Sequence, residues 1–461
     1  MAGNEKVLRR GGFMTLRDQF MSSRGMVLLV TALFLLALGA QYLIKISDQR
    51  RTNRSAIQRW QPQILGLEQG EDISKTYQYP NPPIMSVLLL PLVRLPAMSM
   101  ATIWYCAKVV MAILVLSWSL RLVDPARKLP WWVTAIIVLF SIRPIVGDLQ
   151  HGNVNLFVFF VVMSALMFVA TGRSIIGGVT MALAVSCKVT PLLFIPYFVW
   201  KREWKFLGGW VVGMALFLWP GIVPSMVLGY AENQRNLYSW YHEMVHPFVV
   251  EGKVTSEHSN QSLPGLIFRL GTESPSFVSY PEGVFTPDEF HHVVSLSPRV
   301  AKLIVQGVML AFAGVVVWLC RPVQPQTGRR LIETATWPIL AAEWSFILIG
   351  MLLFSERTWK HHAVTLALPW AVIISAAYNS VFPFTRRFCI GATVVAMAGM
   401  WITSTGLLDD RTAKLGQVYG GYTVAFLIMG CAVVVILREA MLAKRVTGGN
   451  KTSLPPTPIA A

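Results

Sequence analysis

The sequence is poor in charged side chains. Asp, Glu, Lys and Arg make up 14% of the 461 residues, whereas hydrophobic residues make up 54%. A soluble domain carries about 25% charged residues, so the composition excludes an ordinary soluble enzyme and indicates a polytopic membrane protein. Acidic residues are the scarcer kind, 23 against 40 basic ones. The basic residues fall in short clusters between apolar runs, which is the positive-inside pattern of membrane proteins and requires no nucleic-acid partner.

Cysteine and the familiar cofactor motifs are also scarce. The five cysteines lie within or at the edge of apolar runs and no two share a polar loop, so neither a disulfide framework nor a zinc site is indicated. The sequence contains no G-x-x-x-x-G-K-[ST], G-x-G-x-x-G or H-E-x-x-H segment. These absences argue against a nucleotide cradle and against this kind of metal site. We therefore expect neither a cofactor nor a bound metal.

Long apolar runs make up much of the chain. The hydropathy criterion gives twelve of them, many close to the roughly 20 residues of helix that cover a bilayer core. The first run is longer than the apolar core of a signal peptide, so we expect an uncleaved first helix. The runs cover residues 26–45, 101–121, 131–147, 154–171, 174–187, 190–200, 205–226, 299–320, 335–354, 361–378, 387–405 and 418–437.

The basic loops predict the topology. With the N-terminal segment in the cytoplasm, every short basic loop falls on the cytoplasmic side. This holds only if residues 84–97, an apolar piece interrupted by two prolines and an arginine, are interfacial or re-entrant rather than spanning. The tail is expected to be disordered. The predicted division is cytoplasmic segments at 1–25 and 446–461, a transmembrane domain over 26–445, and outer loops at 46–100 and 227–298.

Nearly every unusual polar segment then falls on the outer face. Asp48 directly follows the first apolar run, either as a solvated carboxylate at a helix end or as a catalytic group beside the membrane. Lys188 lies in an apolar stretch, where a charge is costly and is by default a functional hypothesis. A lysine that snorkels to the interface explains it equally well. Arg143 can likewise be a functional cation or a side chain that reaches the interface. For His361 and His362 the alternative to a functional role is anchoring at the membrane interface.

Two more ionisable side chains, Lys108 and Glu343, lie inside apolar runs. Each is expected to pair with a partner in the helix bundle, because an unpaired charge in hydrocarbon is costly. Nothing in the sequence places either of them at a site.

The outer segment 227–298 is too long to be an idle connection. An aromatic ring can stack on the apolar face of a sugar while amides bond its hydroxyl groups, so a mixture of the two indicates sugar recognition. The segment carries this mixture in Trp240, His258, Asn260 and Gln261.

Five motifs in order carry a resemblance. They are YPNPP at 79–83, which closes the loop after Asp48, QHGNVN at 150–155, KVTP at 188–191, NQS at 260–262 and SERTWKHH at 355–362. In this order and on one side, they resemble the family 87 glycosyltransferases of the GT-C superfamily, of the polyprenyl-phosphate-mannose-dependent mannosyltransferase type. Two departures are visible. No aromatic follows Asp48, and the second motif reads QHGN where GQxN is commoner.

The resemblance implies a fold and an activity. The fold is an all-α polytopic membrane protein, a GT-C-like bundle of about 12 transmembrane helices with interfacial helices in the first outer loop. The activity is transfer of a sugar, mannose in this family, from a polyprenyl-phosphate carrier to a lipid or glycan acceptor. The setting is a bacterial inner membrane, among its lipids, with the site on the periplasmic or extracellular face. The runner-up is a transporter or flippase of a lipid-linked or anionic solute, but the inverted repeats typical of transporters are not visible.

The resemblance also implies roles for residues. Asp48 is carried over as the general base of an inverting displacement, and the missing aromatic leaves Glu71 and Asp72 as rivals. The leaving phosphate should meet fixed positive groups, for which the candidates are Lys188, Arg143, His361 and His362. The expected substrate contacts are Tyr79, Gln150, Asn153, Asn155, His258, Asn260, Gln261 and Trp359.

Overall fold

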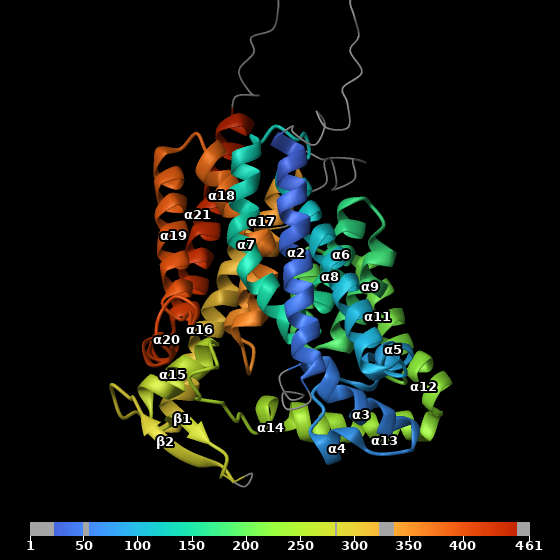
Figure 1. The fold of residues 1–461 in the computed structure, drawn as a ribbon. Helices are drawn as coiled ribbons and strands as arrows, with labels where there is room; N and C mark the ends of the chain where they lie inside the picture. Colours follow the sequence, from blue (N-terminus) through green and yellow to red (C-terminus); the bar gives the residue numbers. More distant parts are fainter. Residues whose placement is uncertain (1–22, 49–54, 282–283, 322–335, 450–461) are drawn as a thin grey trace, which may run out of the picture.

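The computed structural model describes residues 23–48, 55–281, 284–321 and 336–449. Almost all of their secondary structure is helical, as expected for an all-α polytopic membrane protein. The strands found in the described residues are two short ones, β1 (Pro275–Ser279) and β2 (Thr286–Phe290), which pair antiparallel as a ribbon outside the bundle (Figure 1).

Seven helical segments of the described chain are long and apolar enough to cross a membrane, and five apolar helices are shorter. In hydrocarbon the backbone must bond to itself, so apolar runs of this kind form helices. The seven are α2 (Ser23–Ser47), α6 (Ala97–Val123), α7 (Trp131–His151), α11 with α12 (Trp204–Phe217, Ile222–Leu228), α16 (Pro298–Leu319), η6 with α18 (Lys360–Leu366, Ala367–Asn379) and α21 (Gly421–Gly449). The shorter ones are α5 (Pro83–Val93), α8 (Asn155–Ala170), α9 (Ser174–Cys187), η2 with α10 (Thr190–Leu193, Phe194–Trp200) and α17 (Trp337–Leu353). A further helix, α19 (Pro383–Trp401), packs along α21.

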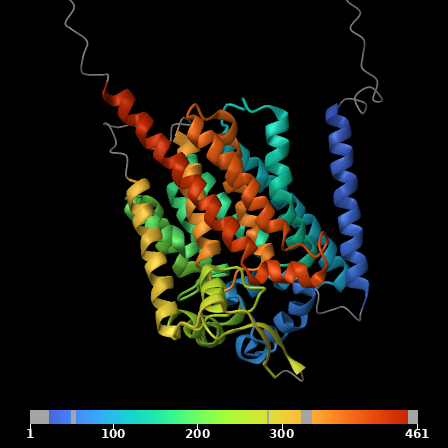
Figure 2. The ribbon, with the colours of Figure 1, turned by 90° about the vertical axis from the view of Figure 1, so that its left-hand side faces the viewer.

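The polar segments gather at one end of the bundle, which we call the polar end. The start of α2 and the end of α21 are both at the opposite end, on different sides of the bundle (Figures 1 and 2). The first outer loop and the segment after α12 therefore meet on one side, as the basic-loop pattern predicts. The elements at the polar end are α3 (Ala56–Glu68), α4 (Ile73–Tyr77), α13 (Tyr230–Trp240), η3 (Tyr241–Val245), α14 (His246–Val249), α15 (Leu263–Gly271), β1, β2 and α20 (Asp410–Val418).

Helix α5 carries the apolar piece that decides the predicted topology. It has 11 residues, which makes it about 16 Å long, roughly half the thickness of a bilayer core. Trp60 and Ile64 of α3 share a buried cluster with Ile84 and Leu89 of α5. The Gln61 amide donates to the carbonyl of Val93, the last residue of α5, and to that of Leu95 just beyond it (2.9 Å to each). A short helix covered by an amphipathic one fits the interfacial position better than a crossing.

Glycines set the contact between α9 and α11. A Cβ on Gly178 of α9 would overlap the backbone carbonyl oxygen of Phe206 on α11, and a Cβ on Gly209 would overlap that of Ile175. Small residues of this kind let membrane helices pack backbone to backbone. Lys188 directly follows α9.

Both predicted intrabundle charges have partners. The Glu343 carboxylate on α17 accepts hydrogen bonds from the Lys201 ammonium (3.0 Å) and the Tyr197 hydroxyl (2.6 Å). Lys108 on α6 pairs with Asp148 on α7, at the border of the site described next.

Candidate active site

A left-handed turn brings the site segments together. Gly152 ends α7 with a φ of 61°, a conformation that glycine adopts without strain. A Cβ here would lie 2.7 Å from the Tyr42 hydroxyl and from the Ser55 hydroxyl, so the turn fits closely against the end of α2 and the start of α3. The Trp104 indole donates to the Gly152 carbonyl (3.0 Å). This packing holds the end of α7 and the start of α8 beside the first loop.

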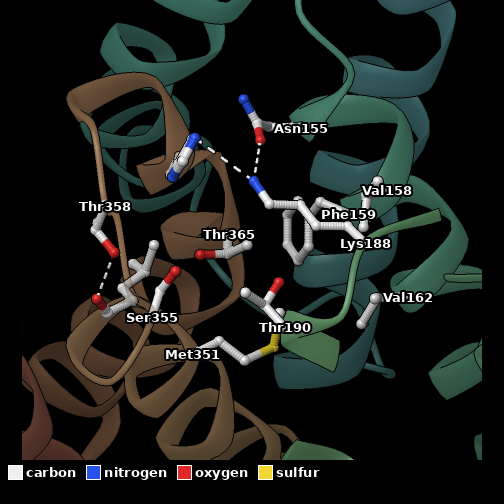
Figure 3. Close-up of a pocket in the computed structure, with 12 residues that line it drawn as sticks. Asn155, Val158, Phe159, Val162, Lys188, Thr190, Met351, Ser355, Thr358 and Thr365 are labelled. Atoms are coloured by element: carbon white, nitrogen blue, oxygen red, sulfur yellow. Dashed lines mark hydrogen bonds between the residues drawn. The ribbon is translucent and has the colours of Figure 1, made fainter. Parts of the chain in front are cut away.

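A pocket opens where α8, the tip of the α9–α10 hairpin and the segment 355–365 meet (Figure 3). One wall is apolar, with Val158 and Phe159 of α8 among its residues. The other side is polar and is formed by Asn155, Lys188, Thr190, Ser355, Thr358, His362 and Thr365. Three motifs that are far apart in the sequence therefore share one cavity.

Lys188 is the charged group of this pocket. Its ammonium donates to Asn155 Oδ1 (2.6 Å) and lies 3.5 Å from His362 Nε2 (Figure 3). Among the described residues no carboxylate makes an ion pair with it. Burial lowers the pKa of Lys188 to about 8, and the more distant Asp148 and Glu356 carboxylates oppose that shift.

His362 lies opposite Lys188 in this pocket. The backbone N–H of Trp359 lies 3.4 Å from His362 Nδ1. Nδ1 therefore lies against the backbone of the segment that leads to the histidines, and Nε2 faces the Lys188 ammonium. The two side chains line the same pocket, and none of its lining residues is a carboxylate. An anion is the ligand that would pair with the Lys188 ammonium there.

His361 and Trp359 lie beside this pair. Asn153 Oδ1 accepts the Val154 N–H (2.7 Å), so its amide nitrogen faces His361 Nε2 (3.1 Å). The His361 ring lies 5.1 Å from that of His151. Trp359 packs against both site histidines, with ring centroids 5.5 and 5.9 Å away, while 37% of the residue is exposed. An exposed ring at this position suits stacking on a sugar.

Asp48 follows α2 at the same end. Three residues before it, the Lys45 ammonium donates to the Gln150 carbonyl (2.9 Å), and the Gln150 amide donates to Gln41 Oε1 (2.8 Å). The sequence-predicted base therefore comes directly after a segment attached to the end of α7, next to His151. Residues 49–54 lie outside the described residues, so the path of the loop beyond Asp48 is not described.

The two rival carboxylates are engaged elsewhere at the polar end. Asp72 caps α4 by accepting the Lys75 N–H (3.1 Å) and also accepts the Ser239 hydroxyl. Glu71 accepts the Tyr77 hydroxyl (2.8 Å). Both therefore serve the packing of α4 and its neighbours.

Tyr79 is fully buried between α3 and α5, edge-on to Trp60 with ring centroids 5.7 Å apart. Burial raises the pKa of Tyr79 to about 12, and Ser86 and Asn81 are its polar neighbours. Arg143 donates to the Met400 carbonyl at the end of α19 (2.6 Å). For both residues a direct substrate contact stays a prediction.

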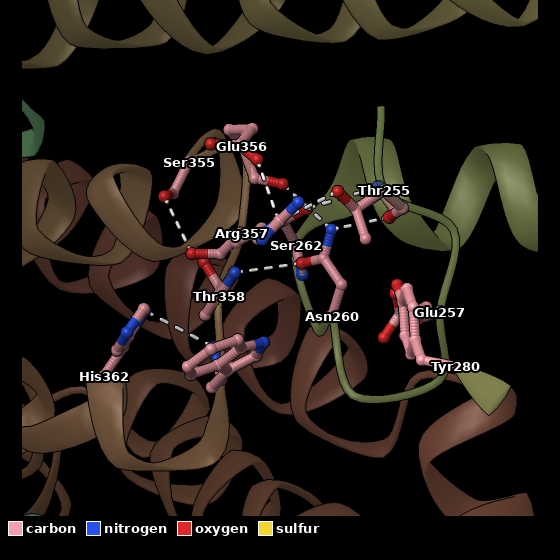
Figure 4. Close-up of polar contacts among 12 residues, drawn as sticks. Thr255, Glu257, Asn260, Ser262, Tyr280, Ser355, Glu356, Arg357, Thr358 and His362 are labelled. Carbon is pink, nitrogen blue, oxygen red and sulfur yellow. Dashed lines mark hydrogen bonds and ion pairs between the residues drawn. The ribbon is translucent and has the colours of Figure 1, made fainter. Parts of the chain in front are cut away.

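The Asn260–Gln261 pair is buried, and its polar atoms bond within the protein. The Asn260 amide donates to the carbonyls of Thr255 (2.8 Å) and Glu356 (2.9 Å) and its oxygen accepts the Thr358 N–H (2.9 Å) (Figure 4). Gln261 donates to the Gln417 carbonyl (2.8 Å). Asn260 therefore braces the segment that carries the site histidines, and Gln261 attaches the same loop to the end of α20. A contact of either amide with substrate stays a prediction.

His258 belongs to the same brace. Its ring stacks on Phe277 at 4.5 Å. Burial lowers the pKa of His258, and a bond to the Ser276 carbonyl opposes the shift. Arg269, from the same outer segment, is fully buried. Its guanidinium donates to the carbonyls of Ser256, Glu257, Asn260, Gln417 and Val418.

Two functional candidates were missed from the sequence, Asp148 and Glu356, and Asp148 is the partner that Lys108 was expected to have. The available signal was the rule that an ionisable residue at membrane depth has a partner. Asp148 is seven residues before Asn155, and its Oδ1 accepts the Asn155 amide N–H (3.2 Å).

The similarity of the chain to known proteins agrees with this arrangement. The model of glycosyltransferase family 87 matches residues 79–340, which span the YPNPP, QHGNVN, KVTP and NQS motifs. The chain is a member of glycosyltransferase family 87. The predicted family and the predicted class of enzyme, a membrane glycosyltransferase, are thereby confirmed.

One curated relative of this family 87 enzyme is the polyprenol-phosphate-mannose-dependent alpha-(1-2)-phosphatidylinositol mannoside mannosyltransferase of Mycolicibacterium smegmatis. It is 24% identical over 349 residues, which is 73% of this chain and 68% of the relative. No solved structure shows significant similarity to the chain.

Proposed function

We propose that this family 87 enzyme transfers mannose from a polyprenyl-phosphate carrier to a lipid-linked acceptor. The observation that carries the proposal is the Lys188 ammonium, which lines the pocket beside His362 and makes no ion pair with a carboxylate of the described residues. A phosphate that leaves a sugar gains negative charge, and fixed donors stabilise that charge. The printed name of the relative, with its polyprenol-phosphate-mannose donor and phosphatidylinositol mannoside acceptor, supports this donor and this acceptor class.

The reaction in this proposal is a single displacement. The acceptor hydroxyl oxygen attacks the anomeric carbon while Asp48 takes the hydroxyl proton. The bond between that carbon and the phosphate oxygen breaks, and its electron pair leaves with the phosphate toward Lys188 and His362. One displacement inverts the anomeric configuration. A carboxylate base contributes about 10²–10⁴-fold to such a step.

Twelve crossings with the polar end on the periplasmic face complete the proposal. Each of the twelve apolar runs contains a helix, and the polar segments share one end of the bundle. Since the described connections between α6 and α7 and between α18 and α19 fall at the other end, the positive-inside rule favours this orientation. A GT-C-like bundle in a bacterial inner membrane fits that arrangement.

The experiment is product formation in liposomes that contain the full chain, labelled polyprenyl-phosphate-mannose and a lipid acceptor extract. Asp48→Asn keeps the shape of the side chain and removes the base, and Asp72→Asn and Glu71→Gln are its matched controls. Transfer by the wild type and both controls, with a loss of at least about 10²-fold in Asp48→Asn, supports the proposal.

The other outcomes are equally informative. Equal transfer by Asp48→Asn would assign the base to another group. A product with retained anomeric configuration would contradict the single displacement. No transfer by the wild type from this donor, with transfer from a nucleotide sugar instead, would overturn the polyprenyl-phosphate assignment.

A further inference from the structure

A fully buried ion pair lies directly behind the pocket. The Lys108 ammonium of α6 is 2.7 Å from Asp148 Oδ2 of α7 and 2.5 Å from the Asp148 carbonyl, and neither side chain is exposed. The Lys108 ammonium lies over the Trp104 ring, 5.8 Å from the ring centroid. Two apolar residues would fill this space at a lower desolvation cost, so a contribution to stability alone does not account for the pair.

Both carboxylate oxygens of Asp148 also contact α8. Oδ1 accepts the Asn155 amide N–H (3.2 Å), and Oδ2 is 3.4 Å from the Leu156 N–H in the first turn of that helix. Val154, the N-cap of α8, supplies no side-chain cap. Asp148 therefore takes the place of a cap at the N-terminus of α8, where negative charge is favourable.

This contact decides which way the Asn155 amide points. A carboxamide has donors at one end and an acceptor at the other. Because Asp148 accepts from Nδ2, Oδ1 must face the opposite side, where it accepts from the Lys188 ammonium at 2.6 Å. Lys188 thus has a strong neutral acceptor, and Lys108 already balances the nearest carboxylate.

We propose that the Lys108–Asp148 pair is a positioning device. Through Asn155 it holds the Lys188 ammonium at the pocket and leaves its positive charge free for an anionic ligand. The inference rests on the proposed role of Lys188 in binding the donor phosphate. Lys108 and Asp148 act through another residue and do not touch the substrate.

Two variants of the full-length protein distinguish a positioning role of the Lys108–Asp148 pair from a purely structural role. Asn155→Asp places a carboxylate against Lys188 with almost no change in volume. The exchange Asp148→Asn with Asn155→Asp keeps the net charge, and the amide that it introduces on α7 can accept from Lys108 and donate to position 155. A purely structural role predicts that the exchange restores wild-type behaviour. The positioning role predicts that the Michaelis constant (KM) for polyprenyl-phosphate-mannose stays raised about 10–100-fold in both variants, with a smaller change in kcat.

A second measurement does not depend on the donor. Labelling of Lys188 with acetic anhydride at a series of pH values, read by mass spectrometry in nanodiscs, reports how far its charge is neutralised. The labelling midpoint should rise by about 1–3 pH units in both variants, and the exposed Asn379→Asp should leave it unchanged. A wild-type labelling profile in both variants would overturn the positioning role, whatever the KM. A wild-type KM in Lys188→Met would instead overturn the proposed donor-phosphate site.

Discussion

Asn260 Oδ1 accepts the backbone N–H of Thr358 at 2.9 Å, although 98 residues separate the two. The same amide donates to the Glu356 carbonyl (2.9 Å), so one side chain holds both edges of the segment that leads to the site histidines. The site is therefore braced from a loop that does not line the pocket.

Asn260→Asp should weaken the brace and with it the site. The substitution puts a carboxylate oxygen against the carbonyls of Thr255 and Glu356 in place of two N–H donors, which should cost about 2–3 kcal/mol of unfolding free energy. We expect a lower thermal unfolding midpoint in detergent and a lower kcat/KM. The exposed Asn379→Asp is the control. A normal midpoint together with a raised KM would contradict the bracing role and favour direct substrate contact.

Donor binding should weaken above about pH 8. Lys188 has its pKa lowered to about 8 by burial, and only its protonated form attracts a phosphate. KM for the donor should therefore rise as the pH passes from 8 to 9, measured by initial rates at several donor concentrations. In Lys188→Arg the cation stays protonated over this range, so its KM should be independent of pH. A wild-type KM that is flat to pH 9 would refute this assignment.

Glu356 should make the protein less stable as the pH rises. Burial raises the pKa of Glu356 from 4.5 to about 7, against the opposing influence of Arg357 and Lys188. The unfolded chain ionises first, so stability is complete below pH 4.5 and falls as the pH rises through 7. Glu356→Gln should flatten this slope and raise stability at pH 8 by about 1–3 kcal/mol.

The measurement for Glu356 is the unfolding midpoint between pH 4.5 and 8. The exposed Glu273→Gln serves as the control and should keep the wild-type slope. An unchanged slope in Glu356→Gln would show that another group is responsible.

Two adjacent glycines of α11 should respond to alanine in opposite directions. A Cβ on Gly209 overlaps the Ile175 carbonyl of α9, whereas a Cβ on Gly208 meets nothing within 4 Å. Gly209→Ala should lose about 1–3 kcal/mol through overpacking, and Gly208→Ala should gain up to about 1 kcal/mol from helix propensity. Unfolding midpoints of the two variants test this. Equal midpoints would mean that the α9–α11 contact is looser than described.

The sequence predicted the helices and the meeting of three motifs better than it predicted individual contacts. Apolar runs report helices because backbone bonding in hydrocarbon leaves few alternatives. Lys188, Asn155 and His362 were all named in advance, and they line one pocket. The basic loops predicted that their segments lie on one side of the membrane.

The sequence could not reveal which groups are the hydrogen-bond partners of a given polar side chain. Asn260 and Asn155 have the same side chain. That of Asn260 bonds to backbone groups of a distant loop, whereas that of Asn155 lines the pocket. Arg143 likewise points to the end of α19. These outcomes depend on partners far away in the chain, and the residues themselves carry no mark of them.

The contacts of Gln261 also determine how late in protein synthesis the loop at Asn260 and Gln261 can be held in place. Gln261 donates to the carbonyl of Gln417 and accepts from the N–H of Tyr422, 156 and 161 residues later. At about 5–20 residues per second a ribosome needs roughly 10–30 s to make that stretch. Throughout this time the loop has been translated and its future partners have not. The newborn enzyme therefore lacks these contacts until the start of α21 is made, and a chain that stops before Gln417 lacks both of these partners of Gln261.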